Sequence, residues 1–444
     1  MPTRLRAGRR WRRPDTLWGN RDFVLLWSGQ TASMLGSRAS ALAFPLLVLE
    51  LTQSPARAGV VGFVAGLPVL LGQLPAGALV DRWDRRTVLI SCDLGRLLII
   101  ASIPVIGWLV GISYPQLLVT ALLHATLSMV FGLAQRSALS QVVDAAALPA
   151  AVARNQATMQ GTAIAGPSLG GVLFGISRVL PFVVDAISYL VSLLTLVLIR
   201  TPLQDPLRQP RRALHREVAD GLRFVWADRY LRVLSLVSAP ITLVIAGFPL
   251  ALIVLARHLG ATPSLLGLIL GISGAGGLLG ALLAPWLVRT IPAGRLNIAG
   301  MWIWGMLLAL LALMPSPLAL APVTAGIAVI GPVLAVIAQT RRATLAPPHL
   351  LGRVYSVSLL ISSGTAPLGS LLAGFLLSWL GGPATCAVLG AALLLIAAAV
   401  TTSPTMRHAD LPGSARDMET CRGEREPASR DKSPYRAGGS RGGR

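Results

Sequence analysis

The sequence contains a long succession of apolar runs, each about 20 residues long and separated by short polar segments. A helix needs roughly 20 apolar residues to cross the hydrocarbon of a bilayer, where every backbone polar group must be paired within the chain. Twelve runs meet this requirement, at residues 22–50, 58–80, 87–109, 116–138, 152–176, 180–200, 231–256, 264–288, 296–315, 318–340, 354–380 and 383–403. The chain is therefore predicted to be an all-α integral membrane protein with twelve transmembrane helices.

The composition and the positions of several prolines agree with this prediction. Only 13% of the residues are charged, whereas soluble proteins average about 25%. Prolines lie between the predicted spans, where they cost a helix little. These residues are Pro55, Pro115, Pro181, Pro263, Pro315, Pro317 and Pro383.

The basic residues favour one orientation of the spans. If both termini are cytoplasmic, the outer loops carry only Arg57, Arg178 and Arg257, and all but five of the 39 basic residues lie on the inner side. This bias follows the positive-inside rule, so we expect a multi-pass protein of the cell membrane. The net charge of +21 then reflects topology and attraction to anionic lipid. Nucleic acid is not an expected partner.

The chain divides into two related halves. A basic tail (1–21) precedes six spans (22–200), a polar central loop (201–229), six further spans (230–403) and a second basic tail (404–444). "GTAIAGPSLGG" places Pro167 in the fifth span, and "SSGTAPLGS" places Pro367 in the eleventh. Such duplication predicts two pseudo-symmetric six-helix bundles with a substrate site between them near the midplane, as in secondary transporters.

A tight group of charges, "VDRWDRR", separates the second and third predicted spans. It resembles the major facilitator superfamily signature, a Gly-x-Leu-x-Asp-Arg-x-Gly-Arg-Arg pattern. The matching residues are Gly77, Leu79, Asp81, Arg82, Arg85 and Arg86. Asp84 stands where the family usually has glycine, and aspartate tolerates the left-handed backbone that would preserve the turn.

The resemblance implies that this loop is a conformational latch. Gly77 lets another helix approach closely, and Asp81 can face a helix N-terminus, which stabilises an anion by about 0.3–1 kcal/mol. The family pattern points to the eleventh span as the partner, and the latch would hold the outward-facing state. The alternative is that Arg82, Arg85 and Arg86 only fix topology and anchor in lipid headgroups.

The fifth span carries a second motif. "GTAIAGPSLGG" resembles the Gly-Pro motif of the superfamily's exporting antiporters, with Gly161, Gly166, Pro167, Gly170 and Gly171 in place. The proline kinks the helix, and the glycines leave a smooth face for packing between the halves. The alternative is an ordinary kinked packing helix.

Further segments, including "PFVVDAISYLVSLL" and "REVADGLRFVWADRYLR", are similar to the transmembrane secretion effector branch, which includes macrolide-efflux-like and enterobactin-exporter-like proteins. The likeness runs from about Arg21 to about Val400. It implies a monomeric drug antiporter that exports a small amphipathic molecule, such as an antibiotic or a siderophore, by alternating access. A proton gradient would supply the energy, and no cofactor is expected.

Few polar residues lie within the predicted spans, and each is a functional candidate because a charge there costs roughly 2.5–3.5 kcal/mol. Arg38 lies near the midplane, where it can bind an anionic or carbonyl-rich substrate or pair with a carboxylate. Asp93 and Arg96 share one helix face and can neutralise each other. Asp185 is either a titrating carboxylate or a residue that fixes the fold.

Uncharged groups complete the set of candidates. Gln30 and Gln160 suit an amphipathic ligand in an apolar cavity, and His124 is either a buried structural histidine or a proton relay. Ser37 and Arg38 stand where relatives often have an acidic residue, which weakens the case for proton coupling. The sequence has no phosphate-binding loop, metal-ligand spacing or catalytic constellation, so an enzyme is not expected. An importer of the same fold and a non-transporting sensor or scaffold stay open as alternatives.

Overall fold

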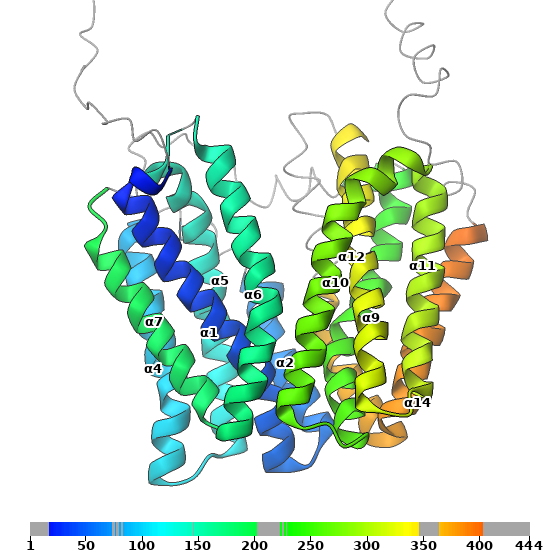
Figure 1. Cartoon of the computed structure of the whole chain (residues 1–444), viewed down its shortest axis with the longest axis horizontal. Helices are drawn as coiled ribbons and strands as arrows, with labels where there is room; N and C mark the ends of the chain where they lie inside the picture. Colours follow the sequence, from blue (N-terminus) through cyan, green and yellow to red (C-terminus); the bar gives the residue numbers. More distant parts are fainter. Residues whose placement is uncertain are drawn as a thin grey trace, which may run out of the picture.

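The computed structural model describes residues 17–402, apart from 73–75, 77–79, 81–82, 145, 202–222, 224–225, 228 and 346–363. Every regular element in this described part is helical, and Figure 1 shows two groups of helices side by side. The first group contains η1 (Leu17–Gly19), α1 (Arg21–Thr52), α2 (Pro55–Leu67), η2 (Pro68–Gly72), α4 (Arg85–Leu109), α5 (Tyr114–Val142), α6 (Leu148–Ile176) and α7 (Leu180–Leu198). The second contains α9 (Arg229–His258), α10 (Pro263–Thr290), α11 (Ala293–Leu310), η3 (Leu311–Leu313), α12 (Pro317–Leu345) and α14 (Ala366–Thr402).

Ten helices of the described structure are long and apolar enough to cross a membrane. The twelve predicted spans differ from these ten at two places. The 29-residue helix α6 is not among the ten, and it carries Asn155, Gln156 and Gln160 in its first half. The other place is α14, which covers parts of the last two predicted spans and is interrupted at Gly381, whose φ of 75° and ψ of 179° are not helical.

Local sequence explains where several helices begin. The hydroxyls of Ser54 and Thr262 accept hydrogen bonds from the backbone N–H groups three residues later, at 3.4 and 3.3 Å. Pro55 and Pro263 follow them directly as first helical residues. A serine or threonine cap followed by proline is a strong helix start, because the proline lacks an N–H that would otherwise be unpaired.

Asp84 also begins a helix, and this corrects the expectation of a left-handed turn. Its backbone is extended, with φ of −64° and ψ of 117°. Its carboxylate accepts 2.8 Å hydrogen bonds from the backbone N–H and the hydroxyl of Thr87. The aspartate that replaces the family's glycine therefore acts as the N-cap of α4.

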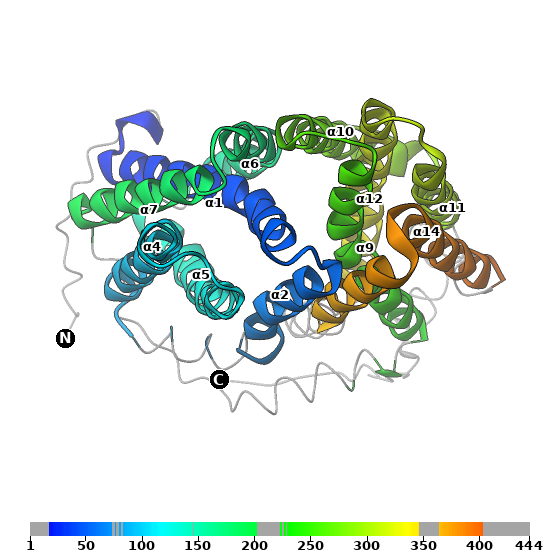
Figure 2. The same ribbon diagram turned by 90° about the horizontal axis from the view of Figure 1, so that it is seen from below.

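The two halves contact each other mainly through two pairs of helices. α6 packs against α10, and α2 packs against α14. Figure 2, viewed along the bundles, shows both pairs at the boundary between the two groups. Within the first group α1 packs on α6 and α7, and α4 packs on α5 and α7. The buried residues of this group include Phe182 and Tyr189 of α7, both fully inaccessible.

Candidate functional site

The crossing of α6 and α10 is built from glycine. A Cβ placed on Gly171 would lie 2.8 Å from the Cα of Gly267, and a Cβ on Gly267 would lie 2.6 Å from the carbonyl oxygen of Pro167. Real Cβ atoms essentially never come within 3.0 Å of a heavy atom on another part of the chain. The two backbones therefore touch as only glycine allows. Gly171 therefore packs directly on the backbone of the other half.

The crossing of α2 and α14 has the same construction. A Cβ on Gly59 would lie 2.8 Å from the Cα of Gly374, and a Cβ on Gly374 would lie 2.8 Å from the Cα of Gly59. The backbone N–H of Ala56 also donates a 2.9 Å hydrogen bond to the hydroxyl of Ser378. This second crossing was not predicted from the sequence.

The two crossings repeat one contact pattern. Gly171 meets the carbonyl oxygen of Pro263 and the backbone of Gly267, and Gly374 meets the carbonyl oxygen of Pro55 and the backbone of Gly59. In each case the proline is the first residue of its helix and precedes the glycine by four positions. The duplication seen in the sequence thus extends to the contacts between the halves.

Both crossings lie toward one end of the helices. We call this end the turn face, which carries Gln53 and Ser177, and the other end the tail face, which carries Asn20 and Thr201. The close glycine contacts of α6 with α10 join residues 163–175 to residues 263–274. Figure 1 shows these two helices converging at the turn face and diverging toward the tail face. The halves are therefore closed together at the turn face and splayed at the tail face.

The other residues of the fifth-span motif pack inside the first half. Gly166 lies against the Cβ of Arg38, and Gly170 lies against the backbone of Ala39. Gly161 has no such neighbour within 4 Å among the described residues. One helix face thus holds α6 to α1, and the adjacent Gly171 holds α6 to α10.

The structure describes only part of the predicted latch. Gly77, Leu79, Asp81 and Arg82 lie outside the described residues, and so do residues 346–363, at the start of the expected partner span. Arg86 donates a 2.7 Å hydrogen bond from Nη2 to the carbonyl oxygen of Val197, which belongs to the same half. In this splayed state Arg86 therefore braces α4 against the end of α7.

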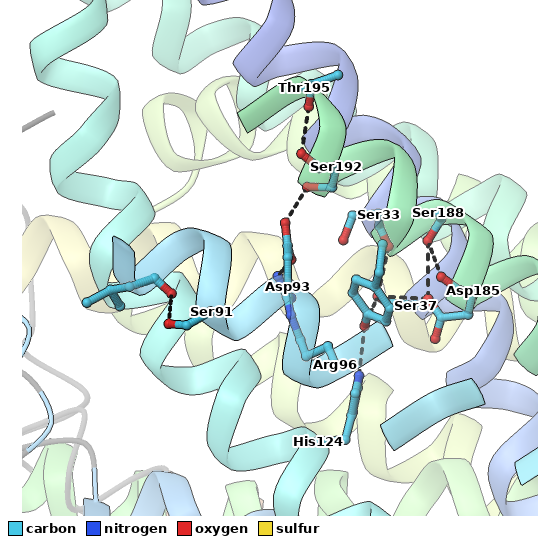
Figure 3. A network of polar contacts seen from close by, with 12 residues as sticks. Ser33, Ser37, Ser91, Asp93, Arg96, His124, Asp185, Ser188, Ser192 and Thr195 are labelled. Carbon is cyan, nitrogen blue, oxygen red and sulfur yellow. Dashed lines mark hydrogen bonds and ion pairs between the residues drawn. The ribbon is translucent and has the colours of Figure 1, made fainter. Parts of the chain in front are cut away.

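A buried polar network fills the centre of the first half (Figure 3). Asp93 forms an ion pair with Arg96 of the same helix, as the sequence predicts, and accepts a 2.7 Å hydrogen bond from the Ser192 hydroxyl of α7. The guanidinium of Arg96 lies 3.8 Å from the ring centre of Phe131 in α5. Asp93 and Arg96 are 0% and 5% exposed, so their charges are neutralised within the bundle.

Tyr189 connects this ion pair to the other helices. Its ring lies 4.7 Å from the guanidinium carbon of Arg96. Its hydroxyl lies 2.7 Å from Nε2 of His124 in α5 and 2.8 Å from the hydroxyl of Ser37 in α1. Four helices are thereby linked through one buried phenol.

Asp185 lies at the far end of the network, with Ser37 and Ser188 beside it. Its Oδ1 is 3.4 Å from each of these two hydroxyl oxygens. Its Oδ2 is buried and has no hydrogen-bond partner among the described residues. The side chain is 0% exposed. Asp185 differs from Asp93 in that no cation in the described part of the chain forms an ion pair with it.

The structure groups some of the predicted site residues and separates others. Asp93, Arg96 and Asp185 share the network, as does His124. Arg38 is exposed, and neither Arg38, Gln30 nor Gln160 has a recorded side-chain hydrogen bond within the described ranges. The roles of these residues in binding or coupling stay predictions.

Ser37 and Tyr189 were not predicted as site residues. The sequence did contain a signal for Tyr189, because the polar residues of α7 recur at helical spacing. Asp185, Ser188, Tyr189 and Ser192 are separated by three, one and three positions, which places them on one face of an otherwise apolar helix. Nothing in the local sequence identified Ser37 as their partner.

Comparison with known proteins gives a consistent family assignment. Residues 18–422 match the family model described as transmembrane secretion effector. The multidrug efflux pump Tap of Mycolicibacterium fortuitum is 30% identical over 405 residues, which cover 87% of this chain and 97% of that protein. The pump of the same name from Mycobacterium tuberculosis is 28% identical over 409 residues, which cover 88% and 96%.

Solved structures share the fold at low sequence identity. The nucleoside transporter NupG superposes with a TM-score of 0.67 at 14% identity, covering 86% of this chain and 97% of that one. A bacterial homologue of the iron transporter ferroportin, in an inward-facing state, superposes with a TM-score of 0.66 at 16% identity, covering 86% and 98%.

Proposed function

The chain belongs to the transmembrane secretion effector family of the major facilitator superfamily, and on this premise we propose that it exports a small amphipathic molecule by alternating access. The family consists of membrane transporters and not of enzymes. The proposed cargo is a drug, an antibiotic or a siderophore-like metabolite. Two relatives that cover nearly the whole chain are named multidrug efflux pumps, and this supports export over import.

The observation that carries the mechanism is the pair of matching glycine crossings at the turn face. Two bundles that meet through two equivalent glycine-to-glycine backbone contacts can rock about them or separate there without unpacking either bundle. On α6, Gly170 packs against α1 and the next residue, Gly171, packs against α10. Motion at the crossing is therefore transmitted within the first half. This arrangement supports alternating access by rocking of the two halves.

Twelve membrane crossings in two pseudo-symmetric bundles of six are part of this proposal. They require that α6 and the segments of α14 on either side of Gly381 each cross the bilayer. An even number of crossings puts both termini on one side, and the distribution of basic residues makes that side the cytoplasm. The state that is splayed at the tail face is then inward-facing.

The latch fits this assignment. In the inward-facing state Arg86 is bound within its own half, and we propose that Asp81 pairs with the eleventh span only when the tail face closes. Proton antiport is the proposed energy source.

The decisive experiment combines a deletion strain with transport in vesicles. The strain is tested for sensitivity to a panel of antibiotics and secreted metabolites, and the compound with the largest effect is then followed in inside-out membrane vesicles. An exporter accumulates this compound in the vesicles when they are energised, and the accumulation collapses with a protonophore. Accumulation in right-side-out vesicles instead would establish an importer, and normal sensitivity to every compound together with no transport would favour a sensor.

A further inference from the structure

Asp185 is a buried carboxyl whose donors among the described residues are neutral hydroxyls, those of Ser37, Ser40 and Ser188. The Ser37 hydroxyl lies 2.8 Å from the carbonyl oxygen of Ser33, and the Ser188 hydroxyl lies 2.7 Å from the backbone carbonyl oxygen of Asp185. Each hydroxyl has one hydrogen, which the short bond uses. Both serines therefore direct their hydrogens mainly to these carbonyl oxygens, and the hydrogen bonds that they donate to Oδ1 of Asp185 are long, at 3.4 Å, beyond the usual range for O–H···O bonds.

The rest of the network adds no short hydrogen bond to this carboxyl. Because the hydrogen of Ser37 points to Ser33, the Tyr189 hydroxyl donates to Ser37, and Nε2 of His124 donates to Tyr189. This order of donors runs away from His124 and ends at the Ser33 carbonyl. It supplies no short hydrogen bond to Asp185, whose Oδ2 has no hydrogen-bond partner among the described residues.

Within the described part of the chain no cation forms an ion pair with Asp185, and the charge of Arg96 acts on it only from a distance. Arg96 of α4 is paired with Asp93, and the Cβ of Arg38 in α1 lies toward α6. Arg178, in the turn between α6 and α7, is exposed. Among the described residues, the polar side chains recorded near Asp185 from α1 are the hydroxyls of Ser37 and Ser40.

We infer that Asp185 holds a proton in this state, and that this is the proton exchanged for substrate. A neutral carboxylic acid has one hydrogen to donate, and a Ser37 lone pair can accept it. An ionised carboxylate in the same place would be a buried charge without a paired cation and with only long hydrogen bonds, which proteins avoid. The inference rests on the proposed antiport only in calling the proton a coupling ion.

The contacts of α1 link the protonation state of Asp185 to the crossing between the halves. A Cβ on Gly36 would lie 2.9 Å from Oδ1 of Asp185, so α1 passes directly over the carboxyl. One turn or less further along, Arg38 and Ala39 pack on Gly166 and Gly170 of α6, and the next residue of α6 is Gly171. When Asp185 loses its proton, Ser37 must turn its own hydrogen from Ser33 to the carboxylate, which changes the contact that positions α1.

An infrared titration of the purified full-length protein tests the proton itself. The C=O stretching band of a protonated carboxyl is followed between about pH 5 and pH 9, a range that spans the usual titration of histidine and buried acids. The band is expected in the wild type and in Asp144→Asn, which changes an exposed loop carboxylate, and is expected to be lost in Asp185→Asn. A band that persists in Asp185→Asn, or a wild type with no such band, would overturn the inference.

Two further measurements test the assignment of the band to a proton on Asp185. Sodium ions added at constant pH should leave the band unchanged, and its loss would instead assign the site to a metal cation. If Asp185→Asn does not fold, Ser37→Ala removes the proposed acceptor and should shift the frequency of the band; an unshifted band contradicts the assignment.

The coupling is tested by a cross-link that does not depend on substrate. Cysteines in place of Ala56 and Ser378, which contact each other across the α2–α14 crossing, report closure of the turn face. The ratio of the cross-linking yield to that of Asp185→Asn at the same pH, which cancels the titration of the thiols themselves, is expected to change at least about twofold across this pH range. Equal pH dependence in both proteins would refute the coupling role. A wild type whose carboxyl band titrates as expected but which exports no drug would refute the proposed function alone.

Discussion

The glycine crossings make a quantitative prediction about the balance between conformations. A methyl group added at Gly171 would lie 2.8 Å from the Cα of Gly267 and 3.0 Å from its nitrogen. Gly171→Ala therefore forces the two backbones apart. Overpacking of this kind costs about 1–3 kcal/mol. The contact belongs to the state that is closed at the turn face, so this cost destabilises that state relative to the other and shifts their ratio by about 5–150-fold.

Gly161→Ala is the matched control, because it makes the same change on the same helix at a position with no close neighbour among the described residues. The assay is cross-linking of cysteines that replace Ala56 and Ser378, introduced into each variant. Cross-linking should fall sharply in Gly171→Ala and stay at the starting level in Gly161→Ala. Equal cross-linking in the two alanine variants would refute the argument that Gly171 holds the closed turn face.

Three further predictions concern single contacts. Arg96→Met leaves Asp93 buried without its cation, which costs about 3–5 kcal/mol, and thermal unfolding in detergent should show a large loss that the additional change Asp93→Leu restores in part. Asp84→Ala removes the N-cap of α4 and should cost about 0.5–2 kcal/mol, whereas Asp84→Gly should cost only a few tenths; equal losses in the same unfolding assay would mean that the cap does not stabilise α4. Asp81→Asn should abolish export at unchanged expression in the vesicle assay, and unaltered export would count against the latch.

The apolar runs predicted the helices well, because the need to pair every backbone group in lipid leaves few other structures. The sequence also identified Gly171 as a packing residue. It did not identify Gly267 or Gly59 as partners, since a glycine in an apolar helix has the same local appearance whether it touches a helix of its own half or of the other. Only the fold decides which backbones meet.

The buried network shows the same limit. Asp93 and Arg96 are three residues apart on one helix, so their ion pair follows from helical geometry alone. The contact of Asp185 with Ser37 joins residues 148 positions apart, and it depends on how α1 crosses α7. Asp84 was misjudged because a family pattern suggested a left-handed glycine turn, whereas the aspartate side chain satisfies a helix N-terminus instead.

The central claim is that the two halves close alternately at opposite faces. Spin labels at positions 144 and 289 report the distance between the halves at the tail face, and labels at positions 178 and 257 report it at the turn face; all four residues are exposed. Pulsed electron resonance should show that any condition that shortens the first distance, such as a change of pH or addition of a transported drug, lengthens the second. Two distances that change in the same direction, or that never change, would contradict the account.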